Sequence, residues 1–378
     1  MSESSAGMSP NATPPGRVGS RRGASRPLGE RDREILKDII RTYVLTGEPV
    51  SSRTLAKREQ HNLSAASIRN VMADLEDDGL LRQPHTSAGR VPTEAAYRLY
   101  IDSLMRLREL PDGLKRHIEQ RLAGAGRDPE RLIATAGSLL SELSQQVGVV
   151  TSPAVDDIVL RSADFLPVGA RRVLCVLVSQ TGFIDHVVVE TDEELSREDL
   201  LRLSNYVTEK FAGRPLPAVR DQLVDRMAVE RAEVDLAMTR ALALAQQAVA
   251  GRARQDVLVE GTAALLGRPE LADLARVRRM LDAFADKARL VDVLSRCLES
   301  NGGVRVLLGD DTDLTSELEF SVVATAYGSR VQTRGVKTLG SLGVVGPSRM
   351  EYPRVVPLVR YLGRTLSRAL SQTAGAAP

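Results

Sequence analysis

A succession of three short helix patterns near the N-terminus, followed by a tight hairpin pattern, constrains the fold of this chain more than any other feature. Apolar residues recur at helical spacing from Ile35 to Val44, and Gly47 ends this first helix. Ser51 or Ser52 is placed to cap a second helix, and Ser64 is placed to cap a third. Three helices this close in sequence predict one compact unit.

The hairpin pattern follows the third helix directly. Two short strands, Leu80 to Gln83 and Arg90 to Val91, flank the polar connection PHTSAG, and a long helix is expected from Pro92 to about Arg108. Three helices and then a hairpin are the order of a winged helix-turn-helix, whose third helix usually enters the major groove of DNA. We therefore expect residues 28–108 to form a DNA-binding domain.

The third helix has one apolar face and one polar face. Its apolar stripe runs from Ile68 to Leu75 and is expected to face the core, which turns the first helical turns outward. Its C-terminal end, from Asp74 to Asp78, is acidic and would be repelled by phosphates. The N-terminal half should therefore face DNA, with Arg69 and Asn70 available to read base edges. The candidate DNA-binding residues are Ser64, Ala65, Ala66, Ser67, Arg69 and Asn70 on this helix and Arg53, His85, Thr86, Ser87 and Arg90 outside it.

Charge by itself does not reveal a nucleic-acid partner. The chain has 51 Lys and Arg against 49 Asp and Glu, a net charge of +2. Arg90 on the expected wing is either a solvated surface charge or a contact to phosphate or the minor groove. Residues 1–27 are rich in Ser, Gly, Pro and Ala and are expected to be a disordered basic arm, which either contacts phosphates or remains solvated.

Two cysteines and the lack of long apolar runs indicate the cell compartment. Cys175 and Cys297 lie far apart in apolar stretches without metal-ligand spacing, so both are expected to be core thiols in a reducing environment. A membrane-spanning helix needs about 20 apolar residues, and no such run is present. We therefore expect a cytoplasmic protein without a membrane partner or a metal.

Several segments are more specific than a general helix-turn-helix pattern. They are LGERDREILKDIIRTYVLTGEPVSSRTLAKR and LSAASIRNVMADLEDDGLLRQPHTSAGRVPTEAAYRLYIDSLM, followed near the C-terminus by GVRVLLGDD, SVVATAY and GSLGVVGPSRMEYPRVVPLVRYL. Together they closely resemble the bacterial heat-inducible transcription repressor HrcA. The family usually has Pro-Ala-Thr where Ala65, Ala66 and Ser67 stand, which predicts an altered operator preference. It usually has Asp where Val71 stands, and Val71 is expected to pack in the core.

The resemblance implies a function and a domain arrangement. Members repress chaperone operons as homodimers on an inverted-repeat operator of the CIRCE type, and heat relieves repression because unfolded proteins occupy the GroEL chaperonin. The implied fold is α+β and multidomain, with no cofactor and no enzymatic activity. A GAF-like domain, residues 109–155 and 251–371, is interrupted by an inserted α+β dimerisation domain, residues 156–250.

The middle of the chain agrees with such an insert. Strand patterns cover Ile158 to Leu166, Arg172 to Ser179 and Phe183 to Glu190, and helix patterns cover Ser196 to Phe211 and about Leu223 to Val249. The last helix has a narrow seam that is either intramolecular core or a subunit interface, and the resemblance favours the interface. The seam consists of Val234, Met238, Ala241, Ala245 and Ala248.

The C-terminal half alternates strands with helices and leaves two alternative functions open. Strands are expected at Val304 to Leu308, Phe320 to Ala326 and Gly340 to Val345, with a final helix from Val355 to Leu370. The first alternative is a metabolite-responsive regulator that senses a ligand through the GAF-like domain. The second is an enzyme that uses the acidic run from Asp310 to Asp313, but no base and nucleophile can be paired with it. A solvated turn explains that run more simply.

Overall fold

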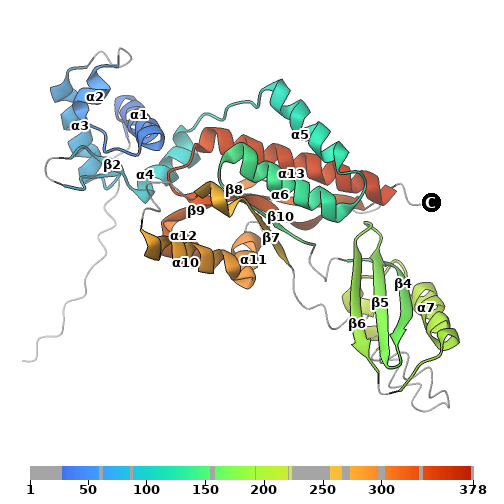
Figure 1. The fold of residues 1–378 in the computed structure, drawn as a ribbon. Coiled ribbons are helices and arrows are strands. Elements are labelled where there is room, and N and C mark those ends of the chain that lie inside the picture. Colours follow the sequence, from blue (N-terminus) through green and yellow to red (C-terminus); the bar gives the residue numbers. More distant parts are fainter. Residues whose placement is uncertain are drawn as a thin grey trace, which may run out of the picture.

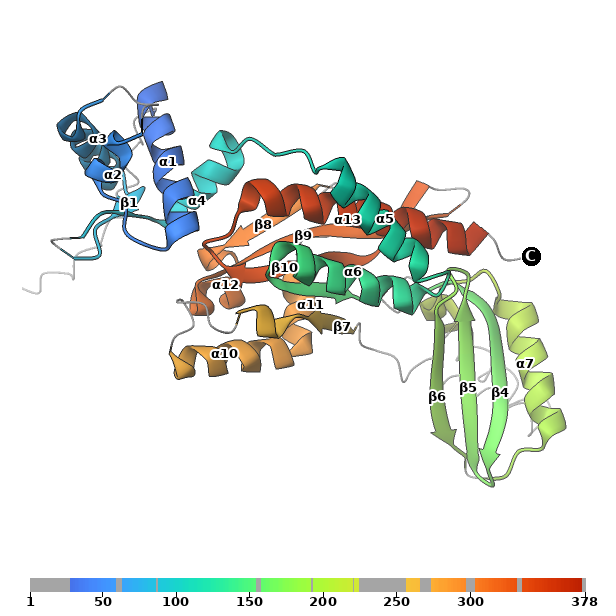
Figure 2. The same cartoon turned by 45° about the horizontal axis from the view of Figure 1, so that its top comes forward.

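The structure is a computed structural model in which helices combine with antiparallel sheets, so the fold is α+β. It forms three units, which we call N-terminal, central and inserted (Figure 1). The N-terminal and inserted units lie at opposite ends of the central one (Figures 1 and 2). The structure describes residues 28–58, 63–85, 88–153, 158–191, 193–219, 221–223, 256–265, 273–296, 303–331 and 335–375.

The N-terminal unit contains the helices and the hairpin predicted from the sequence. Gly47 ends the first helix in the left-handed conformation, and the side chains of Ser51 and Ser64 cap the second and third by accepting from Thr54 N and Ser67 N. The elements are α1 (Glu30–Thr46), α2 (Ser52–Ala56), α3 (Ala65–Asp77), β1 (Leu81–Arg82), β2 (Val91–Pro92), α4 (Glu94–Leu99) and the π-helical η1 (Tyr100–Leu104).

Two predictions for this unit are wrong in extent. Each wing strand has two residues, so the first is shorter than expected and the second lies one residue later. The helix expected to reach Arg108 ends at Leu104, where Met105 turns extended. The backbone N–H of Arg108 donates instead to the carbonyl of Pro353 at 3.2 Å, because the chain crosses to the central unit at this point.

The central unit is a five-stranded antiparallel sheet between two helical layers. Its strands are β3 (Val147–Thr151), β7 (Val257–Glu260), β8 (Val304–Leu308), β9 (Phe320–Val331) and β10 (Gly335–Pro347), in the order β7-β3-β10-β9-β8. One face carries α5 (Asp112–Gly124), α6 (Pro129–Ser144) and α13 (Tyr352–Gly375). The other carries η3 (Thr262–Leu265), α10 (Leu274–Ala285), α11 (Lys287–Ser295), η5 (Gly309–Asp311) and α12 (Asp313–Leu318) (Figures 1 and 2).

Alternation along the strands explains why both faces of this sheet are covered. Successive residues of a strand point to opposite faces, so an uninterrupted apolar run supplies apolar side chains to both faces of the sheet. Val322 packs in the core beneath α10 and α11, and Val323 packs in the core shared with α6 and α13. Likewise, Val345 packs in the core beneath α10 and α11, and Val344 packs in the core shared with α6 and α13. The acidic run expected as a solvated turn is instead helical, in η5 and the start of α12.

The inserted unit leaves the central sheet between two neighbouring strands. Ser152 and Asp256 close its neck, because Ser152 N donates to Asp256 O at 2.8 Å and Asp256 N donates to Ser152 Oγ at 2.9 Å. Helix α7 covers one face of its sheet and encloses the buried Cys175. The described elements are β4 (Leu160–Gly169), β5 (Arg172–Ser179), β6 (Ile184–Glu190) and α7 (Arg197–Phe211), with strand order β4-β5-β6.

Some predictions fall on residues that the structure does not describe. The helix expected from Leu223 to Val249 lies outside the described residues apart from its first residue, and Cys297 lies outside them as well. The whole seam assigned to a dimer interface is outside too, namely Val234, Met238, Ala241, Ala245 and Ala248.

Candidate nucleic-acid interface

Helix α3 presents the two faces that its sequence predicts. Ile68, Val71, Met72 and Leu75 are buried against the rest of the N-terminal unit. Val71 thus packs as expected at the position where the resembled family usually has Asp. Burial of this stripe fixes the rotation of α3 about its axis, so the opposite side of its first turns faces outward.

The outward side of α3 is small and polar. Ala66, Arg69 and Asn70 are exposed, and Ala65 and Ser67 are half-buried. Ser64 begins the helix, where its Oγ accepts from Ser67 N at 3.1 Å and lies 3.0 Å from Ser67 Oγ. Side chains of this size allow a backbone to come close to a groove, and the guanidinium and the amide can form paired hydrogen bonds with guanine and adenine respectively.

Two further arginines border this surface. Arg53, a candidate DNA-binding residue, is exposed on α2. Arg31 is an addition from the structure: its Nη2 donates to Ser67 O at 3.4 Å, which brings an α1 side chain beside the first turn of α3. The sequence could not indicate Arg31, because 36 residues separate it from Ser67 and only packing of α1 on α3 joins them.

Arg90 has a partner inside the protein. Its Nε and Nη2 lie 2.7 and 2.6 Å from Oε2 of Glu76, near the C-terminal end of α3, and the two side chains are 18% and 31% exposed. Its backbone pairs with Val50, with both N–O distances at 2.9 Å. Arg90 therefore joins the wing to the chain before α2 and to α3, and it offsets part of the negative charge at the acidic end of that helix.

The wing itself is described only at its base. Gln83 Nε2 donates to Ala88 O at 2.9 Å across the connection, and His85 is exposed. Thr86 and Ser87, also candidates for DNA contact, lie outside the described residues. The structure thus brings Arg53, His85 and the first turns of α3 into one unit.

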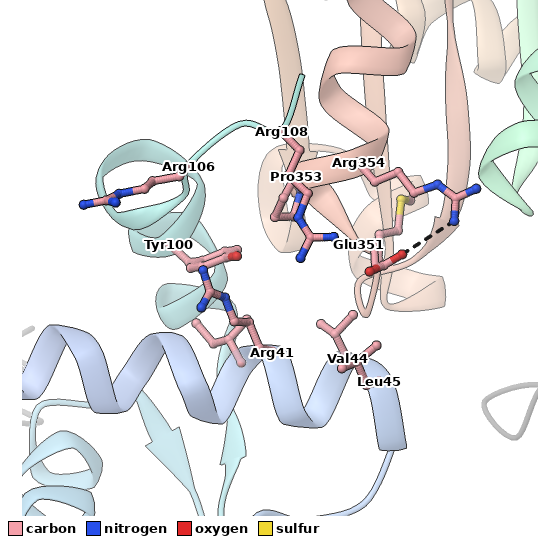
Figure 3. Close-up of a pocket in the computed structure, with 11 residues that line it drawn as sticks. Arg41, Val44, Leu45, Tyr100, Arg106, Arg108, Glu351, Pro353 and Arg354 are labelled. Carbon is pink, nitrogen blue, oxygen red and sulfur yellow. Dashed lines mark ion pairs between the residues drawn. The ribbon is translucent and has the colours of Figure 1, made fainter. Parts of the chain in front are cut away.

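Two clefts separate the N-terminal unit from the central unit. The first, of about 100 Å³, lies between the end of α1 and the start of α13 and is lined by four arginines (Figure 3). The guanidinium groups of Arg106 and Arg354 extend away from it, and Arg354 lies 3.9 Å from Glu351 (Figure 3). The arginines therefore do not converge on one point. The second cleft, of about 350 Å³, lies between α4 and the end of β8.

The described part of the chain offers neither a metal site nor a membrane span. Within it, no cluster of three or more His, Cys, Asp or Glu could hold a metal ion. No helix among those residues is long and apolar enough to cross a membrane.

Comparisons with known proteins find the same family along most of the chain. The family model for the HrcA protein C terminal domain matches residues 130–356. A heat-inducible transcription repressor HrcA of Geobacter sulfurreducens is 40% identical over 343 residues, which cover 91% of this chain and 98% of that protein. The repressor of the same name in Syntrophobacter fumaroxidans is 37% identical and covers the same shares. That of Xanthomonas euvesicatoria pv. vesicatoria is 36% identical, over 91% of this chain and 96% of its own.

The fold is similar to that of a solved structure. It is a crystal structure of a hypothetical protein, with a TM-score of 0.61 and 22% sequence identity, and the match covers 92% of this chain and 100% of that one. At this identity the likeness concerns the fold alone.

Proposed function

The chain belongs to the HrcA family of heat-inducible transcription repressors, and from this premise we propose that it binds an inverted-repeat operator as a homodimer through a winged helix-turn-helix. Membership makes it a negative regulator of heat-shock genes. In the proposal, residues 28–108 form the DNA-binding domain, and α3 is the recognition helix that enters the major groove.

The bipolar surface of α3 carries this proposal. Its first turns expose Ala66, Arg69 and Asn70, and its last turns expose Asp74, Asp77 and Asp78. A phosphate backbone attracts the first end and repels the second, so the helix can enter a groove in only one orientation. Arg53 and His85 then lie beside the same duplex, and Thr86 and Ser87, outside the described residues, remain candidates for contact with it.

A second copy of the chain is proposed to bind the outer face of the inserted sheet. Strand β5 has an almost continuous apolar run, which is typical of a strand buried on both faces. Among the described residues α7 covers only one face, and half-buried and exposed aliphatic groups remain on the other. These groups are Leu174, Val176 and Val178 on β5 and the more exposed Leu166, Ile184 and Val188 on its neighbours.

The remaining parts of the proposal follow from the family. The central unit is a GAF-like domain whose sequence the insert divides, and the protein acts in the cytoplasm without catalysis. Heat stress releases it from the operator by occupying the GroEL chaperonin with unfolded proteins. A dimer interface that loosens on heating would add to release, because a monomer loses the gain in effective concentration that two linked half-site contacts provide.

The operator is tested by fluorescence anisotropy of the full chain on a duplex carrying the inverted repeat of its own chaperonin promoter. The comparison duplex has one half-site scrambled, and both are titrated over a salt series. We expect strong preference for the intact repeat. Arg69→Ala and Asn70→Ala should each cost about 1–3 kcal/mol and relax base preference. Equal binding to both duplexes with a steep salt dependence would contradict sequence-specific recognition.

The dimer interface is tested by sedimentation velocity. Val176→Asp places a charge at the centre of the outer sheet face and should convert the dimer to monomers. Leu201→Asp is the matched control, because Leu201 is 61% exposed on α7 and lies on the covered side of the sheet. Dissociation by the control and not by Val176→Asp would assign the interface to the helical side instead.

A further inference from the structure

The last turn of α1 is completed by a side chain of the central unit. A helix leaves its final carbonyl groups without partners, and cations near them are favourable. Helix α1 has no basic residue in its last turn. Instead, Nη1 of Arg349 donates to the carbonyls of Tyr43 and Val44 at 3.4 and 3.1 Å. Arg349 stands 306 residues beyond Tyr43, in the segment between β10 and α13.

Gly47 lies directly beside this contact. It adopts φ +72°, a conformation that side chains rarely accept, and its N–H donates to Tyr43 O at 2.8 Å. A Cβ at this position would also lie 2.8 Å from Nη1 of Arg349. The absence of a side chain at Gly47 therefore both ends α1 and leaves room for the guanidinium.

A second polar contact of the same kind joins α4 to the end of β8. Arg98 donates to Leu308 O at 3.3 Å and to Oδ2 of Asp311 at 3.1 Å. Beside it is Gly309, at φ +47°, where a Cβ would fall on the carboxylate of Glu94. Hydrogen bonds to Glu94 and Asp311 raise the pKa of Arg98 further above neutral pH. Each contact thus pairs a glycine of one unit with a charged side chain of the other.

The Arg349 and Arg98 contacts are placed where they can set the orientation of the N-terminal unit relative to the central unit. The larger cleft separates the two contacts, and the smaller cleft lies beyond Arg349. Apolar packing also joins the N-terminal and central units, and we call it the apolar anchor. In it, the ring of Tyr97 packs against that of Tyr352, with centroids 6.1 Å apart. Apolar packing is not directional, whereas hydrogen bonds to two fixed carbonyls are. The anchor therefore holds the units together, and the polar contacts define the angle between them.

We propose that Arg349 is a positioning residue that caps α1 from the central unit and thereby sets the half-site spacing that the repressor accepts. This rests on the proposed function, in which a dimer places two recognition helices on two half-sites. Arg349 does not touch DNA in this proposal. It fixes the direction in which each α3 is presented.

The experiment measures affinity of the full chain for operators whose spacer is shortened or lengthened by one and two base pairs. The variants are Arg349→Ala, Arg349→Lys and the control Arg354→Ala, which removes the same charge but whose contacts, to Leu143 O and Glu351, stay within the central unit. Arg349→Ala loses both hydrogen bonds to the end of α1, and we expect it to bind the natural spacing about tenfold more weakly. Its preference for that spacing over shifted ones should fall by a similar factor, while affinity for a single half-site stays unchanged.

Arg349→Lys should restore part of the spacing preference, because an ammonium keeps the charge near the helix end but not the planar arrangement of donors. Equal weakening of Arg349→Ala on every spacing and on the single half-site would overturn the proposal, since that result describes a folding defect. So would an unchanged spacing profile, or a profile altered equally by Arg354→Ala.

A second readout does not depend on the operator. Hydrogen exchange of the Gly47 amide reports the end of α1, and it should accelerate about tenfold in Arg349→Ala and stay at the wild-type rate in Arg354→Ala. If the wild type shows no preference for the intact repeat, the proposed function fails, and this exchange rate still shows whether Arg349 caps α1. No acceleration would refute the cap itself.

Discussion

The ion pair between Arg90 and Glu76 should contribute measurably to the stability of the N-terminal unit. Two guanidinium N–H groups meet one carboxylate oxygen at 2.7 and 2.6 Å, and both side chains are mostly shielded from solvent. Exposed pairs contribute about 0.2–1 kcal/mol, and hydrogen bonds to charged groups contribute about 1.5–3 kcal/mol. Because this pair is partly exposed, we expect a coupling free energy on the order of 1–2 kcal/mol.

The assay is a double-mutant cycle with Arg90→Ala, Glu76→Ala and the double variant. Hydrogen exchange in the full chain gives the free energy of opening for each protein, measured on the α3 amides for this pair and on the α7 amides for the control pair. The matched control is the pair Arg202–Glu198 on α7, which has the same 2.6 Å separation but side chains 68% and 74% exposed. The control should give about 0.3–0.5 kcal/mol. Equal coupling at both sites would refute the argument from burial.

Salt dependence then separates the two roles that Arg90 can have at the operator. A side chain that neutralises one phosphate contributes about 0.9 to the slope of log affinity against log salt concentration, so Arg90→Ala would reduce the slope by that amount if Arg90 binds a phosphate. If Arg90 acts by holding the wing against α3, Arg90→Ala and Glu76→Ala weaken binding together and leave the slope unchanged. A reduced slope in Arg90→Ala alone would assign Arg90 to a phosphate contact.

Three further substitutions test the cap, the core and the separateness of the units. Ser64→Ala removes the N-cap of α3 and should cost about 1 kcal/mol, seen as faster exchange in the first turn of that helix. Tyr352→Phe removes a buried hydroxyl that donates to Ser348 O at 2.7 Å and should cost about 1–2 kcal/mol in urea denaturation. Burial raises the pKa of Tyr352 above the value of about 10 that it has in the unfolded chain. As pH rises past about 10, the unfolded chain therefore ionises first and the free energy of unfolding falls. Tyr352→Phe should lessen that fall. Leu203→Ala leaves a cavity under α7 and should cost about 2–5 kcal/mol, lowering the melting transition of the inserted unit alone in calorimetry, because its core is separate from the others. A shift of every transition together would contradict that separation.

Predictions from the sequence succeeded where the signal was local. The stripe from Ile68 to Leu75, the caps at Ser51 and Ser64 and the strands Arg172 to Ser179 and Val304 to Leu308 depend on neighbours in sequence. Errors occurred in the bounds of the hairpin strands, in the acidic run from Asp310 to Asp313, which is helical, and where distant segments meet. The helix predicted to reach Arg108 stops at Leu104, and the N–H of Arg108 donates to the carbonyl of Pro353 in the central unit.

The sequence by itself determined that the chain is α+β, which face of α3 is buried and which family the motifs indicate, because helical period, strand alternation and capping are properties of short segments. Only the tertiary structure decided the partners of the charged side chains. It paired Arg90 with Glu76, placed Arg31 beside Ser67 and brought Arg349 to the end of α1. These arginines contact groups 14, 36 and 305 residues away in sequence, so the contacts exist only after the helices have packed, and they define how α3 is held.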